Sequence, residues 1–345
     1  MSRRPSGRVV AMSILGVGSV LVAAAYAVQA AHNNGNRLKH VSSPPGEASA
    51  LADLQLRKPL ALLESTALDD RYGHLAVVPL GTPGGPRTMT ALPCMRVDFA
   101  ADRGVCLAKD DGLLPSYTAT VFDRSFHPLY HASLGGLPSR VRLSADGRVA
   151  ATTVFVSGHS YTAAFSTATT FIDTRSGSDL GNLEGFSISR NGESFHPADS
   201  NFWGVTFASD SHHFYATMAT GGNTYLIAAD LSSRTAQVVH ENVECPSLSP
   251  DNTRIAFKKR VDSGQGPITW RFSVLDLRTM REWPLTENRS IDDQMAWLDN
   301  SELTYGISDG NSHDPQVDTW VVAADGRGTP RLLASQAASF VVART

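Results

Sequence analysis

The sequence predicts an all-β fold, a six-bladed β-propeller with four-stranded blades. Two observations lead to this prediction: a strand–turn–strand unit recurs along the chain, and the two ends of the repeat region hold complementary parts of one further unit. The clearest unit spans residues 244–260, where Leu248 precedes a Ser-Pro-Asp-Asn turn. Proline fixes φ in such a turn, and Asp and Asn bond to their own backbone. Ile255 and Phe257 then follow at the period of a strand.

Five copies of this unit carry an aspartate in the turn. These marker residues are Asp102, Asp146, Asp210, Asp251 and Asp299. Successive markers are 44, 64, 41 and 48 residues apart, and about 40–50 residues make one four-stranded propeller blade. The second unit is longer because it carries insertions within residues 157–169 and around 187–200. A single hairpin cannot bury its apolar face, so the copies are expected to pack against one another.

A sixth blade is divided between the two ends of the repeat region. Residues 339–342 begin a blade that has no room to finish, whereas residues 74–80 and 87–92 resemble outer strands that lack a start. Joining them closes the ring with both ends of the chain in one blade, and closure removes exposed sheet edges. The propeller is therefore predicted to span residues 71–345.

The first residues bear on the compartment. Residues 1–8 form a basic cytoplasmic segment with Arg3, Arg4 and Arg8, and residues 9–31 carry no charge. This run predicts either a transmembrane signal anchor or a signal peptide cleaved near Ala25-Tyr26-Ala27, and the propeller is extracytoplasmic in both cases. Residues 32–70 are expected to be a linker; a short helix within 48–63 would be broken by Pro59.

Composition argues against nucleic acid as a partner. The formal net charge is -3 and the sequence pI is about 6.4, which is not the signature of a polyanion-binding surface. The histidines lack zinc-site spacing, and Asp292, Asp293 and Asp299 lack the spacing of a calcium loop. No cofactor and no metal are therefore expected.

Three cysteines leave one question open. An oxidising compartment favours a disulfide between Cys94 and Cys106. If Phe99 paired with Val105, however, Cys94 would lie about 13 Å from the position opposite Cys106, which is too far for a disulfide unless the chain bends. Both outcomes remain open, and Cys245 is expected to be a buried thiol.

The segment at residues 158–162 (Gly-His-Ser-Tyr-Thr) has a faint likeness to the nucleophile elbow of hydrolases. That elbow needs a strand–turn–helix, whereas this segment has predicted strands on both sides. We therefore interpret the segment as a propeller loop and expect no catalytic residue in it.

The repeats resemble those of the TolB-like family of β-propellers over residues 71–345. The resemblance is carried best by residues 247–257, with their Ser-Pro-Asp turn. More narrowly, residues 155–161, 201–207 and 292–294 are similar to TolB-like translocation proteins of actinobacteria that carry a signal segment. The resemblance implies a non-catalytic protein that binds other envelope proteins or peptides. No βαβ pattern precedes residue 71, so the family's usual N-terminal α/β domain is not expected.

Propeller topology brings polar and aromatic residues together at one mouth of the central channel. The starts of the innermost strands and the loops between second and third strands share this face, where propellers bind ligands or partners. The predicted binding residues are Arg140, His159, Tyr161, Asn201, Trp203, Glu244, Lys258, Arg260, Asp292 and Asp293. An alternative interpretation makes the charged members a structural network, in which Glu244 and the aspartates neutralise Arg140 and Lys258.

The favoured function is binding of an envelope protein or peptide partner at this mouth. One alternative is a glycosidase or lyase acting on cell-wall glycan, with Glu244 and Asp293 as its two carboxylates about 5–10 Å apart. Arginine partners on both carboxylates would exclude it. Another alternative is a purely structural scaffold, whose mouth would be plugged by apolar side chains.

Overall fold

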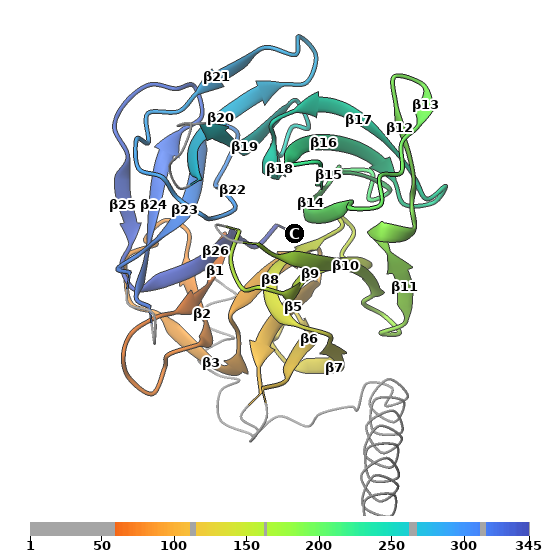
Figure 1. The fold of residues 1–345 in the computed structure, drawn as a ribbon. Helices are drawn as coiled ribbons and strands as arrows, with labels where there is room; N and C mark the ends of the chain where they lie inside the picture. The colour runs from red at the N-terminus through yellow and green to blue at the C-terminus, as the bar shows by residue number, and fades with distance from the viewer. Residues whose placement is uncertain (1–58, 111–114, 162–163, 262–267, 311–314, 345) are drawn as a thin grey trace, which may run out of the picture. The chain divides into compact units, whose positions relative to one another are not determined.

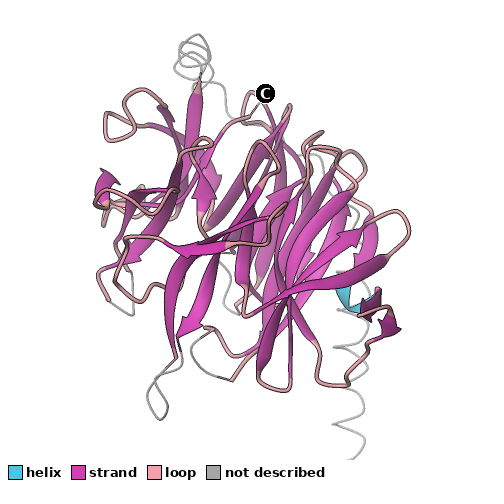
Figure 2. Cartoon of the chain, turned by 90° about the horizontal axis from the view of Figure 1, so that it is seen from above, coloured by secondary structure: helices cyan, strands magenta, loops and turns pink. Residues whose placement is uncertain are grey.

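Six antiparallel blades surround a central channel in the computed structural model (Figure 1). The structure describes residues 59–110, 115–161, 164–261, 268–310 and 315–344. Almost all of these residues lie in strands and loops, and the short 3-10 helix η1 (Leu183–Gly185) is the one helix among them (Figure 2). The prediction of an all-β, six-bladed propeller with four-stranded blades is confirmed.

The first three blades are each built from the inner strand outwards. Blade 1 consists of β4 (Arg96–Ala100), β5 (Arg103–Lys109), β6 (Tyr117–Asp123) and β7 (Pro128–Leu134). Blade 2 consists of β8 (Leu137–Leu143), β9 (Val149–Ser157), β10 (Ser166–Asp173) and β11 (Asp179–Asn182). Blade 3 consists of β14 (Asn201–Phe207), β15 (His213–Thr220), β16 (Asn223–Asp230) and β17 (Thr235–Glu241). It is extended outwards by β12 (Ser187–Arg190) and β13 (Glu193–Ser194), which come from the predicted insertion.

The other three blades follow the same pattern. Blade 4 consists of β18 (Glu244–Leu248), β19 (Arg254–Val261), β20 (Thr269–Asp276) and β21 (Glu282–Pro284). Blade 5 consists of β22 (Ala296–Trp297), β23 (Glu302–Ser308), β24 (Val317–Ala323) and β25 (Arg331–Ala334). Blade 6 consists of β26 (Ala337–Val342), β1 (Leu60–Ser65), β2 (His74–Pro79) and β3 (Thr88–Pro93).

Strand β1 corrects the predicted domain boundary. The ring is closed by both ends of the repeat region in one blade, as predicted, but the second strand of that blade lies within the segment expected to be a linker. β1 pairs with β26 through Leu62 and Val341, and with β2 through Leu63 and Ala76. All six residues of β1 are buried, so the strand shows no alternation of apolar and polar residues. Periodicity cannot distinguish such a run from a buried helix.

The predicted basic segment and the uncharged run at residues 9–31 lie outside the described residues. Within the described residues, no helix is long and apolar enough to cross a membrane.

The marker aspartates organise the turns between first and second strands. Ser249 Oγ donates to Asp251 Oδ1 at 2.5 Å, and Thr253 N–H donates to the same oxygen. Asn252 adopts the left-handed conformation that this turn requires, with φ +58°. Asp251 N–H then donates to Asn300 Oδ1 in the neighbouring blade. The turn chemistry that is visible in the sequence therefore also links adjacent blades.

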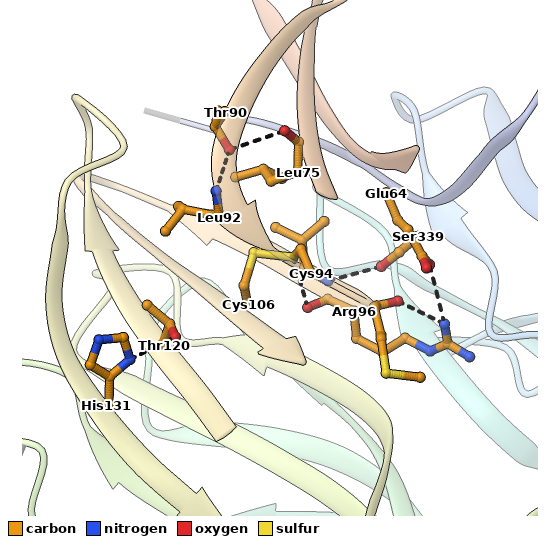
Figure 3. The surroundings of a disulfide bond; sticks show 12 residues. Glu64, Leu75, Thr90, Leu92, Cys94, Arg96, Cys106, Thr120, His131 and Ser339 are labelled. Atoms are coloured by element: carbon orange, nitrogen blue, oxygen red, sulfur yellow. Dashed lines mark hydrogen bonds and ion pairs between the residues drawn. A yellow bond between two sulfur atoms is a disulfide. The ribbon is translucent and has the colours of Figure 1, made fainter. Parts of the chain in front are cut away.

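Cys94 and Cys106 form a disulfide in the structure, with their Cα atoms 5.0 Å apart (Figure 3). Phe99 pairs with Gly104 rather than with Val105, which places Val97 opposite Cys106. Cys94 precedes β4 in a bend between blades 6 and 1, where its N–H donates to Gly73 O. The bend removes the distance that an extended chain would impose, and the bond fastens the closing blade to blade 1.

Candidate binding site at the channel mouth

The inner strands of the blades run in the same direction around the channel, because each blade repeats the order of the one before it. Their starts therefore share one face with the loops that join second and third strands. We call this the loop face, and the opposite side, which holds the tight turns between first and second strands, the turn face. Eight of the ten predicted residues gather on the loop face around blades 2 to 5. This mouth cluster consists of Arg140, Tyr161, Trp203, Glu244, Lys258, Arg260, Asp292 and Asp293.

Lys258 is the centre of the mouth cluster. Its side chain on β19 is fully buried, and its Nζ lies 2.5 Å from Asp292 Oδ1. The ammonium also lies over the rings of Trp270 and Tyr161, 4.4 and 5.0 Å from their centroids. Burial opposes the charged form, but acidic neighbours including Asp292 and Glu244 outweigh it and raise the pKa of Lys258. The cation is therefore held by one carboxylate and two aromatic faces.

Glu244 forms the second ion pair of the mouth cluster. It is fully buried at the start of β18, and its Oε1 accepts a hydrogen bond of 2.5 Å from Arg260 Nε. The backbone of Arg260 is fixed by Asn242, whose side chain accepts from Arg260 N–H and donates to Arg260 O. Glu244 stands opposite Lys258 in the register of β18 and β19, so this strand pair contributes to both ion pairs.

Arg140 and Asp293 form the third pair. Arg140 Nη2 lies 3.5 Å from Asp293 Oδ1, and Nη1 donates to Ser139 O. Asp293 Oδ2 accepts from Gly306 N–H at 2.7 Å, which ties the pair to β23 in blade 5. Two of the three ion pairs therefore link blades 2 and 4 to the segment that precedes β22, and the hydrogen bond from Gly306 extends the network to β23 of blade 5.

Tyr161 and Trp203 form the aromatic side of the mouth cluster. Both are buried, with ring centroids 5.4 Å apart, and Phe165 packs against both rings. The Tyr161 hydroxyl is hydrogen-bonded to Ser139 Oγ at 2.6 Å. Burial raises the pKa of the Tyr161 phenol above its ordinary value, so it stays neutral. The mouth of the channel is thus closed by aromatic side chains together with the three ion pairs.

Two predicted residues lie outside the mouth cluster. Asn201 Oδ1 accepts from the N–H and the hydroxyl of Thr167, which fastens β14 to β10 of the preceding blade. His159 is exposed in the loop after β9. A binding role for the ten residues stays a prediction. The pairs of the two aspartates with Arg140 and Lys258 match the structural network of the alternative interpretation, whereas Glu244 pairs with Arg260 instead.

Sequence reasoning missed Trp270 as part of the site. It pairs with Arg260 as the second residue of β20 and is almost fully buried. Propeller topology places the start of the third strand near the mouth, so this position in the repeat is the signal that could have found Trp270. Cys245, predicted to be a buried thiol, is buried beside this cluster, and burial raises its pKa.

A hollow of about 450 Å³ borders the mouth cluster on the loop face. Its lining comes from blades 2, 3 and 4, including Phe165, Asn201, Trp203, Arg260 and the Gly221-Gly222 turn. Both glycines have positive φ, and the positions that a Cβ would take are open. The hollow is therefore bounded by a rigid aromatic and charged side and by a turn with accessible backbone.

The fold is shared with solved propeller structures. TolB from Acinetobacter baumannii matches with a TM-score of 0.57 and 16% identity, over 87% of this chain and 68% of TolB. This match shows that the chain has the β-propeller fold that is also found in TolB. A chain of the nidogen/laminin complex matches at TM-score 0.49 and 12% identity, over 83% of this chain and 98% of its own. A puromycin-hydrolyzing peptidase from Mycobacterium tuberculosis matches at TM-score 0.46 and 11% identity, over 87% of this chain and 45% of its own. The sequence matches no protein-family profile and no curated protein.

In this propeller, both carboxylates that a glycosidase mechanism would need have an arginine partner. Glu244 is bonded to Arg260, and Asp293 is paired with Arg140. A glycosidase needs one carboxylic acid that can give up its proton and a second carboxylate free to act as base or nucleophile. Each carboxylate is occupied by an arginine partner, which is the arrangement expected to exclude this alternative.

Proposed function

We propose that this protein is a non-catalytic binding scaffold of the cell envelope whose loop face takes a protein or peptide partner. The observation that carries the proposal is the hollow of about 450 Å³ beside the mouth cluster. Concave sites of mixed polarity, bounded by aromatic side chains and a few fixed polar groups, are where proteins bind ligands and peptides. The ion pairs of the mouth cluster keep one side of the hollow rigid, which lowers the entropic cost of binding.

The groups around the hollow suit an extended peptide segment. Arg260 is 28% exposed at its side chain, and its Nε donates to Glu244 while its Nη1 donates to Gly222 O. The guanidinium N–H groups that these two bonds do not use can reach a partner. Asp199 accepts from Thr220 Oγ1 and Gly221 N–H, which fixes the turn between β15 and β16. A fixed turn with open backbone at Gly221 and Gly222 can approach a peptide closely.

The compartment in the proposal rests on the sequence. Basic residues before the uncharged run at 9–31 support export, either with a retained membrane anchor or after cleavage of a signal peptide. The Cys94–Cys106 disulfide fits an oxidising compartment. The similarity of residues 155–161 and 201–207 supports a place among the TolB-like proteins of actinobacteria that carry a signal segment.

Site-specific photo-cross-linking in cell envelopes tests the proposal. A photoreactive phenylalanine at Asn223 would lie on the loop face beside the hollow, whereas one at Ser233 lies in the same blade but in the turn between β16 and β17. Both positions are exposed. We expect a discrete protein or peptide adduct from position 223, none from position 233, and loss of the adduct when Ser166→Trp fills the hollow. Equal labelling at both positions, or an adduct that persists in a folded Ser166→Trp protein, would overturn the proposal.

A further inference from the structure

A second cavity lies at the other end of the channel, on the turn face. It has a volume of about 200 Å³ and is lined by residues from the inner strands of all six blades or from the turns that follow them. Three of its lining residues are charged: Asp98 from β4, Arg142 from β8, and Arg344 just after β26. Two cations therefore face one anion in a confined space.

The single carboxylate does not neutralise the two arginines. Asp98 Oδ2 accepts a hydrogen bond of 2.7 Å from Leu143 N–H. Arg142 Nη1 donates to Val141 O at 2.9 Å, and Arg344 Nη2 donates to Trp297 O at 2.7 Å. Within the described part of the chain, neither guanidinium has a carboxylate oxygen within ion-pair distance. Both keep N–H groups that these carbonyl contacts do not use.

Arg344 is held in place by its backbone rather than by an ion pair. Its carbonyl accepts a hydrogen bond of 2.9 Å from Ala101 N–H, and it forms a bridge with Ala100 at the end of β4. Arg142 is fixed within β8, where it pairs with Ala151. The two guanidinium groups thus come from blades 2 and 6, far apart in the sequence, and are brought to one cavity by the closure of the ring.

The electrostatics of the cavity indicate an excess of positive charge. Burial lowers the pKa of Arg142, and repulsion from Arg140 adds to this, while Asp98 and, more weakly, Asp293 counteract it. Burial likewise lowers the pKa of Arg344, which Asp98 opposes and repulsion from Arg142 reinforces. Arginine stays protonated in proteins, so the charge is retained and an anion that enters the cavity would be stabilised.

We propose that this cavity binds a small oxyanion, a carboxylate or a phosphate group, between the guanidinium groups of Arg142 and Arg344. Guanidinium groups present paired N–H donors that match the oxygens of both anions. Thr206 and Ser249 also line the cavity and add hydroxyl groups to its wall. The site lies at the opposite mouth from the hollow on the loop face and does not depend on the function proposed above.

Titration with inorganic phosphate at low ionic strength tests the site. Binding is measured by calorimetry on the purified protein, with chloride at matched ionic strength as the reference. We expect saturable binding of phosphate and an affinity at least about tenfold weaker in Arg142→Gln and in Arg344→Gln. Arg278→Gln is the matched control, because Arg278 is exposed in the turn after β20 and should leave the affinity unchanged.

Asp98→Asn provides a test of opposite sign. The amide oxygen of asparagine can still accept from Leu143 N–H, but the competing negative charge is lost, so phosphate should bind several-fold more tightly than to the wild type. A structural defect cannot produce this gain. Acetate and succinate titrations then show whether the preferred oxyanion is a carboxylate or a phosphate. Binding no stronger than that of chloride, or an Asp98→Asn affinity equal to or weaker than wild type, would overturn the proposal.

Discussion

Replacing Asp292 by asparagine tests whether ion pairs hold the mouth cluster together. The substitution keeps the size of the side chain but removes the anion that lies 2.5 Å from Lys258 Nζ. Lys258 is fully buried, so its ammonium is left in the interior, where the rings of Trp270 and Tyr161 and the carboxylate of Glu244 are its remaining compensation. Breaking a buried ion pair from one side costs about 3–5 kcal/mol. Because the Asp292 side chain is 25% exposed, water can reach the site and the lower end, about 3 kcal/mol, is expected.

Removing the cation of this pair instead of the anion should cost much less stability. Lys258→Met removes the buried charge and keeps an unbranched apolar stem, and it leaves Asp292 partly in contact with water. We expect a loss of about 1 kcal/mol in the free energy of unfolding, and little further loss when Asp292→Asn is added. The double-mutant cycle should therefore give a coupling energy of about 2 kcal/mol or more.

Urea unfolding of the four proteins, followed by tryptophan fluorescence and circular dichroism, measures these free energies. A matched control is the ion pair between the adjacent Lys259 and Glu282, whose side chains are 35% and 30% exposed. Glu282→Gln should cost no more than about 1 kcal/mol, because partly exposed pairs contribute little. A loss below about 1 kcal/mol in Asp292→Asn, or a double mutant as unstable as the two single losses added together, would refute the reasoning.

Three further predictions concern blade 6 and its attachment. Replacing both Cys94 and Cys106 by alanine should lower the free energy of unfolding by about 3 kcal/mol, since the bond closes a loop of sequence separation 12; an unchanged urea midpoint would contradict this. Burial, opposed by Arg96, raises the pKa of Glu64 to about 8 from 4.5. Above pH 4.5 the folded state therefore keeps a proton on Glu64 that the unfolded state releases, which destabilises the wild type as the pH rises. Glu64→Gln should match the wild type near pH 4, and its free energy of unfolding relative to the wild type should rise by about 1.4 kcal/mol per pH unit up to pH 8. Stability curves of the two proteins that stay parallel over this range would contradict the prediction. Leu62→Ala in the fully buried strand β1 should cost about 3 kcal/mol, and an equal loss in the exposed control Leu180→Ala would argue against closure by β1.

The repeat architecture could be predicted because its signals are local. The turn at residues 249–252 depends on residues that bond to their neighbours, and the strands on either side show their own periodicity. Spacing between the turns then indicates the number of blades. Strand β1 could not be predicted from periodicity, because both of its faces are buried and its residues therefore do not alternate between apolar and polar. Its place is decided by pairing with β26, at the other end of the chain.

The amino-acid sequence was also enough to place the ten predicted residues on the loop face, because topology puts the starts of inner strands and the loops between second and third strands there. Eight of the ten gather in the mouth cluster. The sequence could not decide what they do there. Which carboxylate meets which cation, and whether a side chain is buried or open, depends on the packing of blades far apart in sequence. Lys258 meets Asp292 across 34 residues, and Arg142 shares a cavity with Arg344. Such contacts form only when the ring closes, since long-range distances are set by tertiary packing and not by the spacing of residues along the chain.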